Sequence, residues 1–92
     1  MKSRYVLADK IDTHCIQILE LLFIASYQNR EEKLPTIRMA LRRTDVLKFL
    51  VRIVWELRAL DNKRYAELSE KIHELGRMIG GWKKGLESKT PR

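Results

Sequence analysis

Residues 62–86 read NKRYAELSEKIHELGRMIGGWKKGL, and this stretch has the most regular apolar pattern in the sequence. Its apolar side chains recur at alternating steps of three and four residues: Tyr65, Leu68, Ile72, Leu75, Ile79, Trp82 and Leu86. That spacing stacks them along one face of an α-helix over about three heptads. The pattern predicts a long helix over residues 62–86 that packs its apolar face against other helices.

Two earlier stretches also show helical periodicity. The first spans residues 3–29, with Ser3 as the expected N-cap, and the second spans residues 35–60, with Pro35 in its first turn. The first stretch carries two apolar stripes, formed by Leu7, Ile11, Cys15, Ile18, Leu22 and Ala25 and by Ile16, Leu19 and Phe23. A helix that is apolar over so much of its circumference needs more than one neighbour.

The connections between the expected helices are short and polar. Residues 29–33 form the first break, and Asp61-Asn62 supplies the second turn and the next N-cap. Residues 87–92 are polar, and we expect this tail to be frayed. Three long helices joined by short turns pack antiparallel. We therefore expect one all-α domain over residues 1–92, an antiparallel up-and-down bundle with more apolar surface than three helices can bury alone.

The composition excludes several classes of protein. A single cysteine rules out an internal disulfide and a multi-cysteine zinc site. The longest apolar run is the five residues 21–25, far below the ~18 that a membrane span needs. The N-terminus lacks the apolar core of a signal peptide. We expect a cytoplasmic protein with no membrane association.

Few side chains have the chemistry for catalysis or metal binding. His14, Cys15 and His73 are the only soft ligands, and no metal-site spacing joins them. On a helix, adjacent His14 and Cys15 point about 100° apart, which does not suit a nucleophile and its base. We expect Cys15 to be a buried structural residue, His73 to pack at a helix crossing, and the protein to have no catalytic residue, metal or cofactor. A small all-helical enzyme remains a distant alternative.

Basic residues are the feature of this sequence that stands out. Lys and Arg number 19 against 12 Asp and Glu, which gives a net charge of +7. The candidates for a surface that binds phosphate backbones are Arg38, Arg42, Arg43, Lys48 and Arg52 in the second segment, and Arg58, Arg77, Lys83 and Lys84 after it. An ordinary solvated surface, with lysines favouring a helix C-terminus, is the alternative interpretation.

The run Glu74-Leu75-Gly76-Arg77-Met78-Ile79-Gly80-Gly81-Trp82 resembles the E-(I/L/V)-G-R-(M/I)-(I/L)-G-(G/S)-W signature of Avd proteins. These are the accessory variability determinants of diversity-generating retroelements. Segments 4–11, 33–35 and 47–60 also resemble Avd segments in the same order, so the resemblance covers roughly residues 3–86.

The resemblance implies a four-helix bundle that assembles into a basic homopentamer with no catalytic activity of its own. It also implies binding to the retroelement reverse transcriptase and to template RNA or cDNA, in support of mutagenic retrohoming. Avd proteins have a helix before the stretch that starts at Arg4, whereas three residues precede it here. We therefore expect that helix to be absent. Either the protein is naturally short, or its start is truncated. A stand-alone rRNA intervening-sequence protein with the same bundle is the alternative.

A helix-packing or oligomer interface is expected around the glycines of the last segment. Each glycine inside a helix lowers its stability by about 1 kcal/mol relative to alanine, so the presence of Gly76 and Gly80 calls for a structural explanation. Close approach of a neighbouring helix, in the bundle or across a subunit interface, is the simplest one. The residues expected at this interface are Gly76, Gly80, Trp82, Ile79 and Phe49.

Overall fold

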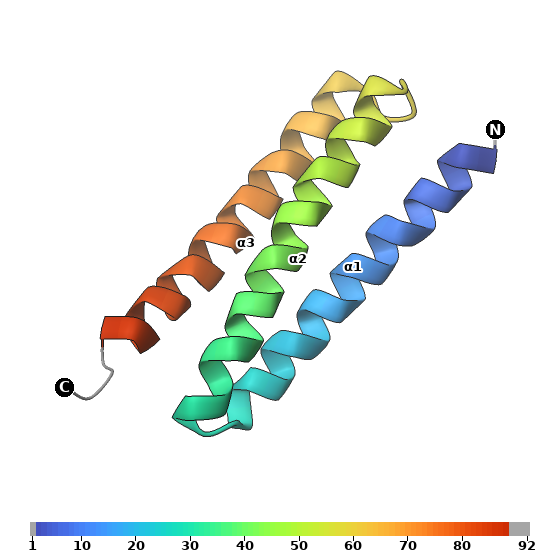
Figure 1. The fold of residues 1–92 in the computed structure, drawn as a ribbon. Coiled ribbons are helices and arrows are strands. Elements are labelled where there is room, and N and C mark those ends of the chain that lie inside the picture. Colours follow the sequence, from blue (N-terminus) through green and yellow to red (C-terminus); the bar gives the residue numbers. More distant parts are fainter. Residues whose placement is uncertain (1, 89–92) are drawn as a thin grey trace.

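The structure is a computed structural model that describes the backbone of residues 2–88 and the side chains of residues 6–88. Within this range the chain forms three α-helices and no strand: α1 (Lys2–Tyr27), α2 (Arg30–Glu56) and α3 (Asn62–Ser88). Consecutive helices run antiparallel (Figure 1). The predicted all-α antiparallel bundle is confirmed, with three helices.

Two predicted helix boundaries at the ends of the chain were wrong. α1 includes Lys2, so Ser3 lies inside the helix and is not its N-cap. α3 continues to Ser88, whereas the sequence predicted fraying from residue 87. The rest of the predicted frayed tail, residues 89–92, lies outside the described residues.

α2 begins five residues before the predicted start at Pro35, because Asn29 caps it. The Asn29 side-chain oxygen accepts a hydrogen bond from the Glu32 backbone N–H at 2.9 Å. Glu31 and Glu32 lie in the first turn, where negative charge interacts favourably with the helix dipole. This cap satisfies an otherwise unpaired N–H at the start of α2, and the helix continues through Pro35 without the hydrogen bond that proline cannot donate.

α2 also ends at Glu56, four residues before the predicted end. Arg58 adopts a left-handed backbone with a φ of 62°. The Arg58 N–H donates to the Trp55 carbonyl at 2.9 Å, and the Ala59 N–H donates to the Val54 carbonyl at 3.0 Å. These two bonds form a Schellman motif, which glycine usually terminates because a side chain disfavours positive φ. Because residue 58 is an arginine and not a glycine, the sequence did not indicate that α2 ends here.

The turn into α3 is held by side chains on both sides. Asp61 caps α3 as predicted, since its Oδ1 accepts from the Arg64 N–H at 2.7 Å. The Trp55 ring stacks on Tyr65, with centroids 4.4 Å apart, and the indole Nε1 donates to Asn62 Oδ1 at 2.7 Å. The C-terminal end of α2 and the first turn of α3 are thereby fixed to each other.

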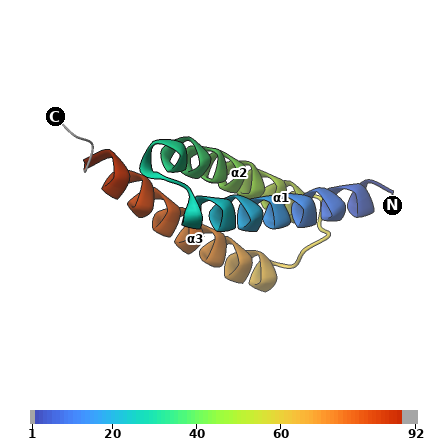
Figure 2. The same cartoon turned by 90° about the horizontal axis from the view of Figure 1, so that it is seen from below.

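The core forms where α2 contacts both of the other helices. α2 packs against α1 and α3, whereas no described Cα atom of α1 lies within 8 Å of a Cα atom of α3. Figure 1 shows α1 and α3 on either side of α2, and Figure 2, seen from below, shows both of them displaced to the same side of α2. One hydrophobic cluster joins the three helices through Ile18, Ala25, Ile37, Ala40, Leu47, Val51, Ile72 and Ile79. The chain therefore has a single core centred on α2.

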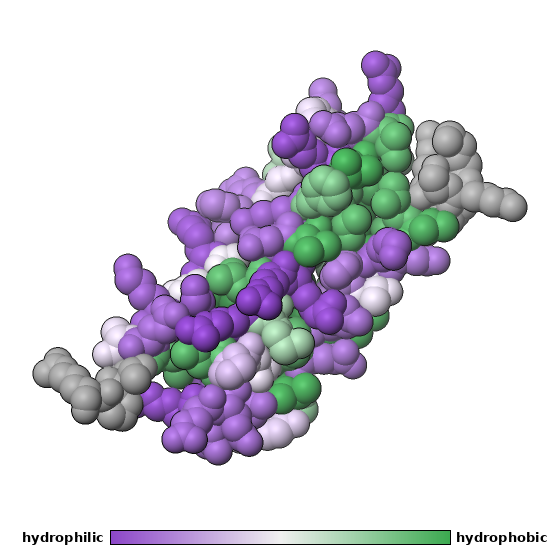
Figure 3. All heavy atoms as spheres, viewed as in Figure 1, coloured by the Kyte–Doolittle hydropathy of each residue, from purple (hydrophilic) through white to green (hydrophobic). Residues whose placement is uncertain are grey.

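Much apolar surface lies outside this core. The second stripe of α1 is uncovered, with Leu19 64% and Phe23 66% exposed. Figure 3 shows apolar side chains among charged ones, gathered where the C-terminal half of α2 lies beside α1. Exposed apolar residues on α2 include Val46, Phe49 and Leu57. The expectation that three helices leave apolar surface uncovered is confirmed.

Candidate nucleic-acid and partner interfaces

Four of the predicted cations lie exposed on α2: Arg38, Arg42, Lys48 and Arg52. Three of them have acidic partners: Arg38 with Glu87 at 3.2 Å, Lys48 with Asp45 at 3.9 Å, and Arg52 with Glu56 at 3.3 Å. Exposed ion pairs contribute about 0–1 kcal/mol, so a phosphate can compete for each of these cations. This face of α2 keeps the chemistry expected of a polyanion-binding surface.

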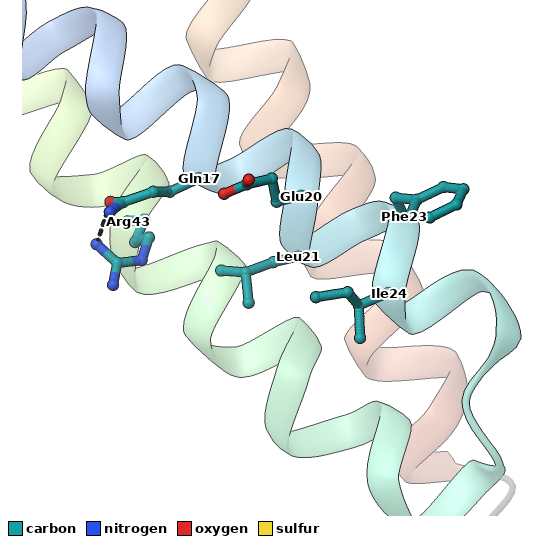
Figure 4. Close-up of a pocket in the computed structure, with 6 residues that line it drawn as sticks. All are labelled: Gln17, Glu20, Leu21, Phe23, Ile24 and Arg43. Carbon is teal, nitrogen blue, oxygen red and sulfur yellow. Dashed lines mark hydrogen bonds between the residues drawn. The ribbon is translucent and has the colours of Figure 1, made fainter.

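Arg43 differs from the other α2 cations in its surroundings. It is half-buried, and its Nη1 donates to Gln17 Oε1 on α1 at 2.7 Å (Figure 4). The pair lies at one end of a hollow between α1 and α2 that is also lined by Leu21 and Ile24. The structure separates Arg43 from the exposed cations with which the sequence grouped it.

The remaining predicted cations lie on α3 and on the turn before it. Arg58, Arg77 and Lys84 are exposed, and Lys83 is half-buried. The charges are unevenly shared among the helices. α2 carries seven basic and four acidic residues and α3 carries six and four, whereas α1 carries three of each. The molecule thus combines a basic α2–α3 part with a neutral α1 that exposes apolar side chains.

The glycines of α3 do not bring a second backbone of the same chain close. A Cβ on Gly76 would lie 3.5 Å from Lys48 Nζ and 3.7 Å from Thr44 Cγ2, which are ordinary contacts. A Cβ on Gly80 would have no atom within 4 Å. Close helix approach within the chain therefore does not explain either glycine, and contact with a second copy remains a prediction.

We expect Gly80→Leu to lower the mass of the oligomer while the chain stays helical. Leucine favours a helix by about 1 kcal/mol over glycine, so the substitution alone does not unfold α3. Light scattering measures the mass and circular dichroism the helicity. Gly81→Leu is the control, because this neighbouring glycine is equally open but points about 100° away. A Gly80→Leu protein of unchanged mass would contradict the interface.

The other predicted interface residues fall into two groups. Ile79 is buried in the core, and Trp82 packs against it with Lys33 Nζ 5.7 Å from the ring centroid. Phe49 is 59% exposed, so it does not pack in the core of its own chain. Its assignment to an interface between copies stays a prediction.

The residues considered for catalysis do not form a site. Cys15 is exposed, because no described helix covers that side of α1. The predicted burial of Cys15 was therefore wrong. Partial desolvation, and then the charge of Asp12, raise the pKa of the Cys15 thiol, which disfavours the nucleophilic thiolate. His14 Nδ1 is buried without a hydrogen-bond partner among the described residues. Across those residues, no group of three His, Cys, Asp or Glu side chains is placed to hold a metal ion.

The described part of the chain also contains no helix with the length and apolarity needed to cross a membrane.

The fold and its surfaces define a small, basic, all-α protein with three antiparallel helices and uncovered apolar faces. Within that class the chain belongs to the bAvd-like family, whose family model matches residues 1–86. Searches of the curated proteins and of the solved structures found no match.

The sequence did not predict which of the site residues are exposed and which are covered by another helix. The exposure of Phe49, the Arg43–Gln17 hydrogen bond and the left-handed Arg58 depend on which helix faces are covered and where α2 stops. The Lys-and-Arg pattern alone gives no signal for any of them. The sequence even predicted Phe49 at a helix-packing or oligomer interface.

Proposed function

We propose that this protein is a non-catalytic accessory protein of a diversity-generating retroelement. It binds the element's reverse transcriptase and its template RNA or cDNA in the cytoplasm, and thereby supports mutagenic retrohoming. Membership of the bAvd-like family is the observation that carries this proposal. The exposed cations of α2 and α3 support the nucleic-acid part, since phosphate contacts supply most sequence-independent affinity.

The working form that we propose is a homopentamer. A folded monomer of 10.9 kDa typically exposes about 5,600 Å², whereas this chain exposes 6977 Å². The excess includes the exposed apolar side chains of α1, and contact with other copies would remove them from water. Five copies of a chain with charge +7 carry 5 × 7 = +35, a field strong enough to steer a polyanion toward the assembly.

Reconstitution with a diversity-generating-retroelement reverse transcriptase from the same genome tests the proposal. We expect the two proteins to co-elute from size exclusion as one complex in which the oligomer is intact, and to bind the template RNA together. The matched control is a reverse transcriptase from an unrelated retroelement type. If the cognate enzyme elutes separately at micromolar concentrations in low salt, the accessory role is wrong.

A further inference from the structure

A hollow of about 620 Å³ lies between the outer faces of α2 and α3. Its lining from α2 comprises Lys48, Phe49 and Arg52, and its lining from α3 comprises Tyr65, Ser69, Glu70 and His73. The volume lies within the range of sites that take a small organic group. The hollow therefore has room for a flat ring beside Phe49.

Phe49 is not needed for the packing of its own chain. Its neighbour Leu50 is buried, whereas the Phe49 side chain is 59% exposed. On a helix, the residues that flank Phe49 in space lie three and four positions away: these are the charged Asp45 and Arg52 and the apolar Val46 and Ile53. An exposed aromatic ring with charged side chains beside it is available to a ligand.

The charged surroundings of Phe49 favour a nucleic acid over a protein partner. Lys and Glu are depleted at protein–protein interfaces, but Lys48 and Glu70 both line this hollow beside the ring. A single nucleic-acid strand needs a ring with cations beside it, because its bases stack on aromatic rings while its phosphates contact Lys and Arg. A duplex keeps its bases stacked on one another and offers none to Phe49.

We propose that this hollow is a base-stacking site for single-stranded nucleic acid, in which an unpaired base lies against Phe49. Lys48 and Arg52 contact the flanking phosphates. Their present partners, Asp45 and Glu56, are themselves exposed, so phosphate can replace them. Glu70 lies on the α3 side of the hollow, so the strand's phosphates run along the α2 side. This inference rests on the proposed nucleic-acid function. It adds that the ligand is a single strand and that Phe49 distinguishes a single strand from a duplex.

Fluorescence anisotropy with a labelled, unstructured RNA of about 12 nucleotides, and with the same RNA annealed to its complement, tests the proposal. We expect Phe49→Leu to weaken single-strand binding about tenfold and to leave duplex binding unchanged. Phe49→Trp retains the single-strand affinity, because a larger ring still stacks. Glu70→Gln tightens single-strand binding about twofold, since it removes a repulsive charge.

Tyr27→Leu is the matched control, because Tyr27 is an aromatic residue of similar exposure that lies at the end of α1, outside the hollow. Unchanged single-strand affinity of Phe49→Leu, in a protein whose cations still give salt-dependent binding, overturns the stacking site and leaves the proposed function standing. Equal losses for single strand and duplex, or a changed oligomer mass, also overturn it and place Phe49 in an interface between copies. Absence of binding to either RNA by the unmodified protein overturns the proposed nucleic-acid function as well.

Discussion

Replacing both Leu19 and Phe23 of α1 with glutamate is expected to reduce the oligomer to single chains of 10.9 kDa. Both side chains are exposed in the single chain, so the substitution removes nothing from its core. Burying one such apolar side chain between copies contributes about 1.5–3 kcal/mol, and burying an unpaired charge instead costs several kcal/mol. The combined change at each interface between copies corresponds to a factor of more than about 1,000 in the association constant.

Lys10→Glu is the control for this substitution. Lys10 is an exposed residue of α1, and exchanging it for glutamate changes the net charge from +7 to +5, as the double substitution does. We expect the Lys10→Glu protein to keep the oligomer mass in light scattering and the double variant to lose it, with both keeping their helicity. A double variant that retains its mass would show that the α1 stripe is not the contact surface.

Replacing Arg38, Arg42 and Arg77 together with glutamine is expected to weaken nucleic-acid binding about 100-fold at ~0.1 M salt. Each phosphate-binding cation that is removed reduces the slope of log affinity against log salt by about 0.7 for a single strand and about 0.9 for a duplex. Removing all three therefore reduces the slope by about 2 to 3. Because phosphates carry no sequence information, the decrease in affinity should be similar for all sequences. Titrations at several salt concentrations measure both quantities.

A second triple variant separates this surface from the effect of total charge. Lys10, Arg43 and Lys63, all replaced by glutamine, give the same net charge of 7 − 3 = +4. Arg43 is half-buried and bonded to Gln17, so we expect this variant to keep most of the salt slope. If the two variants show the same decrease in slope, binding depends on the total charge of the protein and not on a defined surface of α2 and α3.

The fold was largely predictable because the apolar spacing is regular. The three- and four-residue steps in residues 62–86 predicted α3, and Ile72 and Ile79 of that pattern are buried. The ends of α2 were not predictable from periodicity. The side chain of Asn29 starts the helix ahead of Pro35, and Arg58 ends it in a conformation that usually requires glycine. Single local interactions decide such boundaries, and periodicity averages over them.

The candidate site was predictable in its residue types and not in its arrangement. Lys and Arg content identified the cations, since charge is read directly from composition. Which cation is exposed depends on the packing of whole helices, as the half-buried Arg43 shows. Cys15 and Phe49 lie on faces that the sequence assigned to contacts, and in the single chain these faces are open. Periodicity identifies an apolar face but does not say whether its partner is in the same chain.

Absolute mass in solution, measured by light scattering coupled to size exclusion at low and high salt, shows whether copies of this chain associate. We expect a pentamer of 5 × 10.9 = 54.5 kDa at both salt concentrations, because apolar contacts are not screened by salt. A monomer near 10.9 kDa at both concentrations would contradict this expectation, since the exposed stripe of α1 would then have no partner copy.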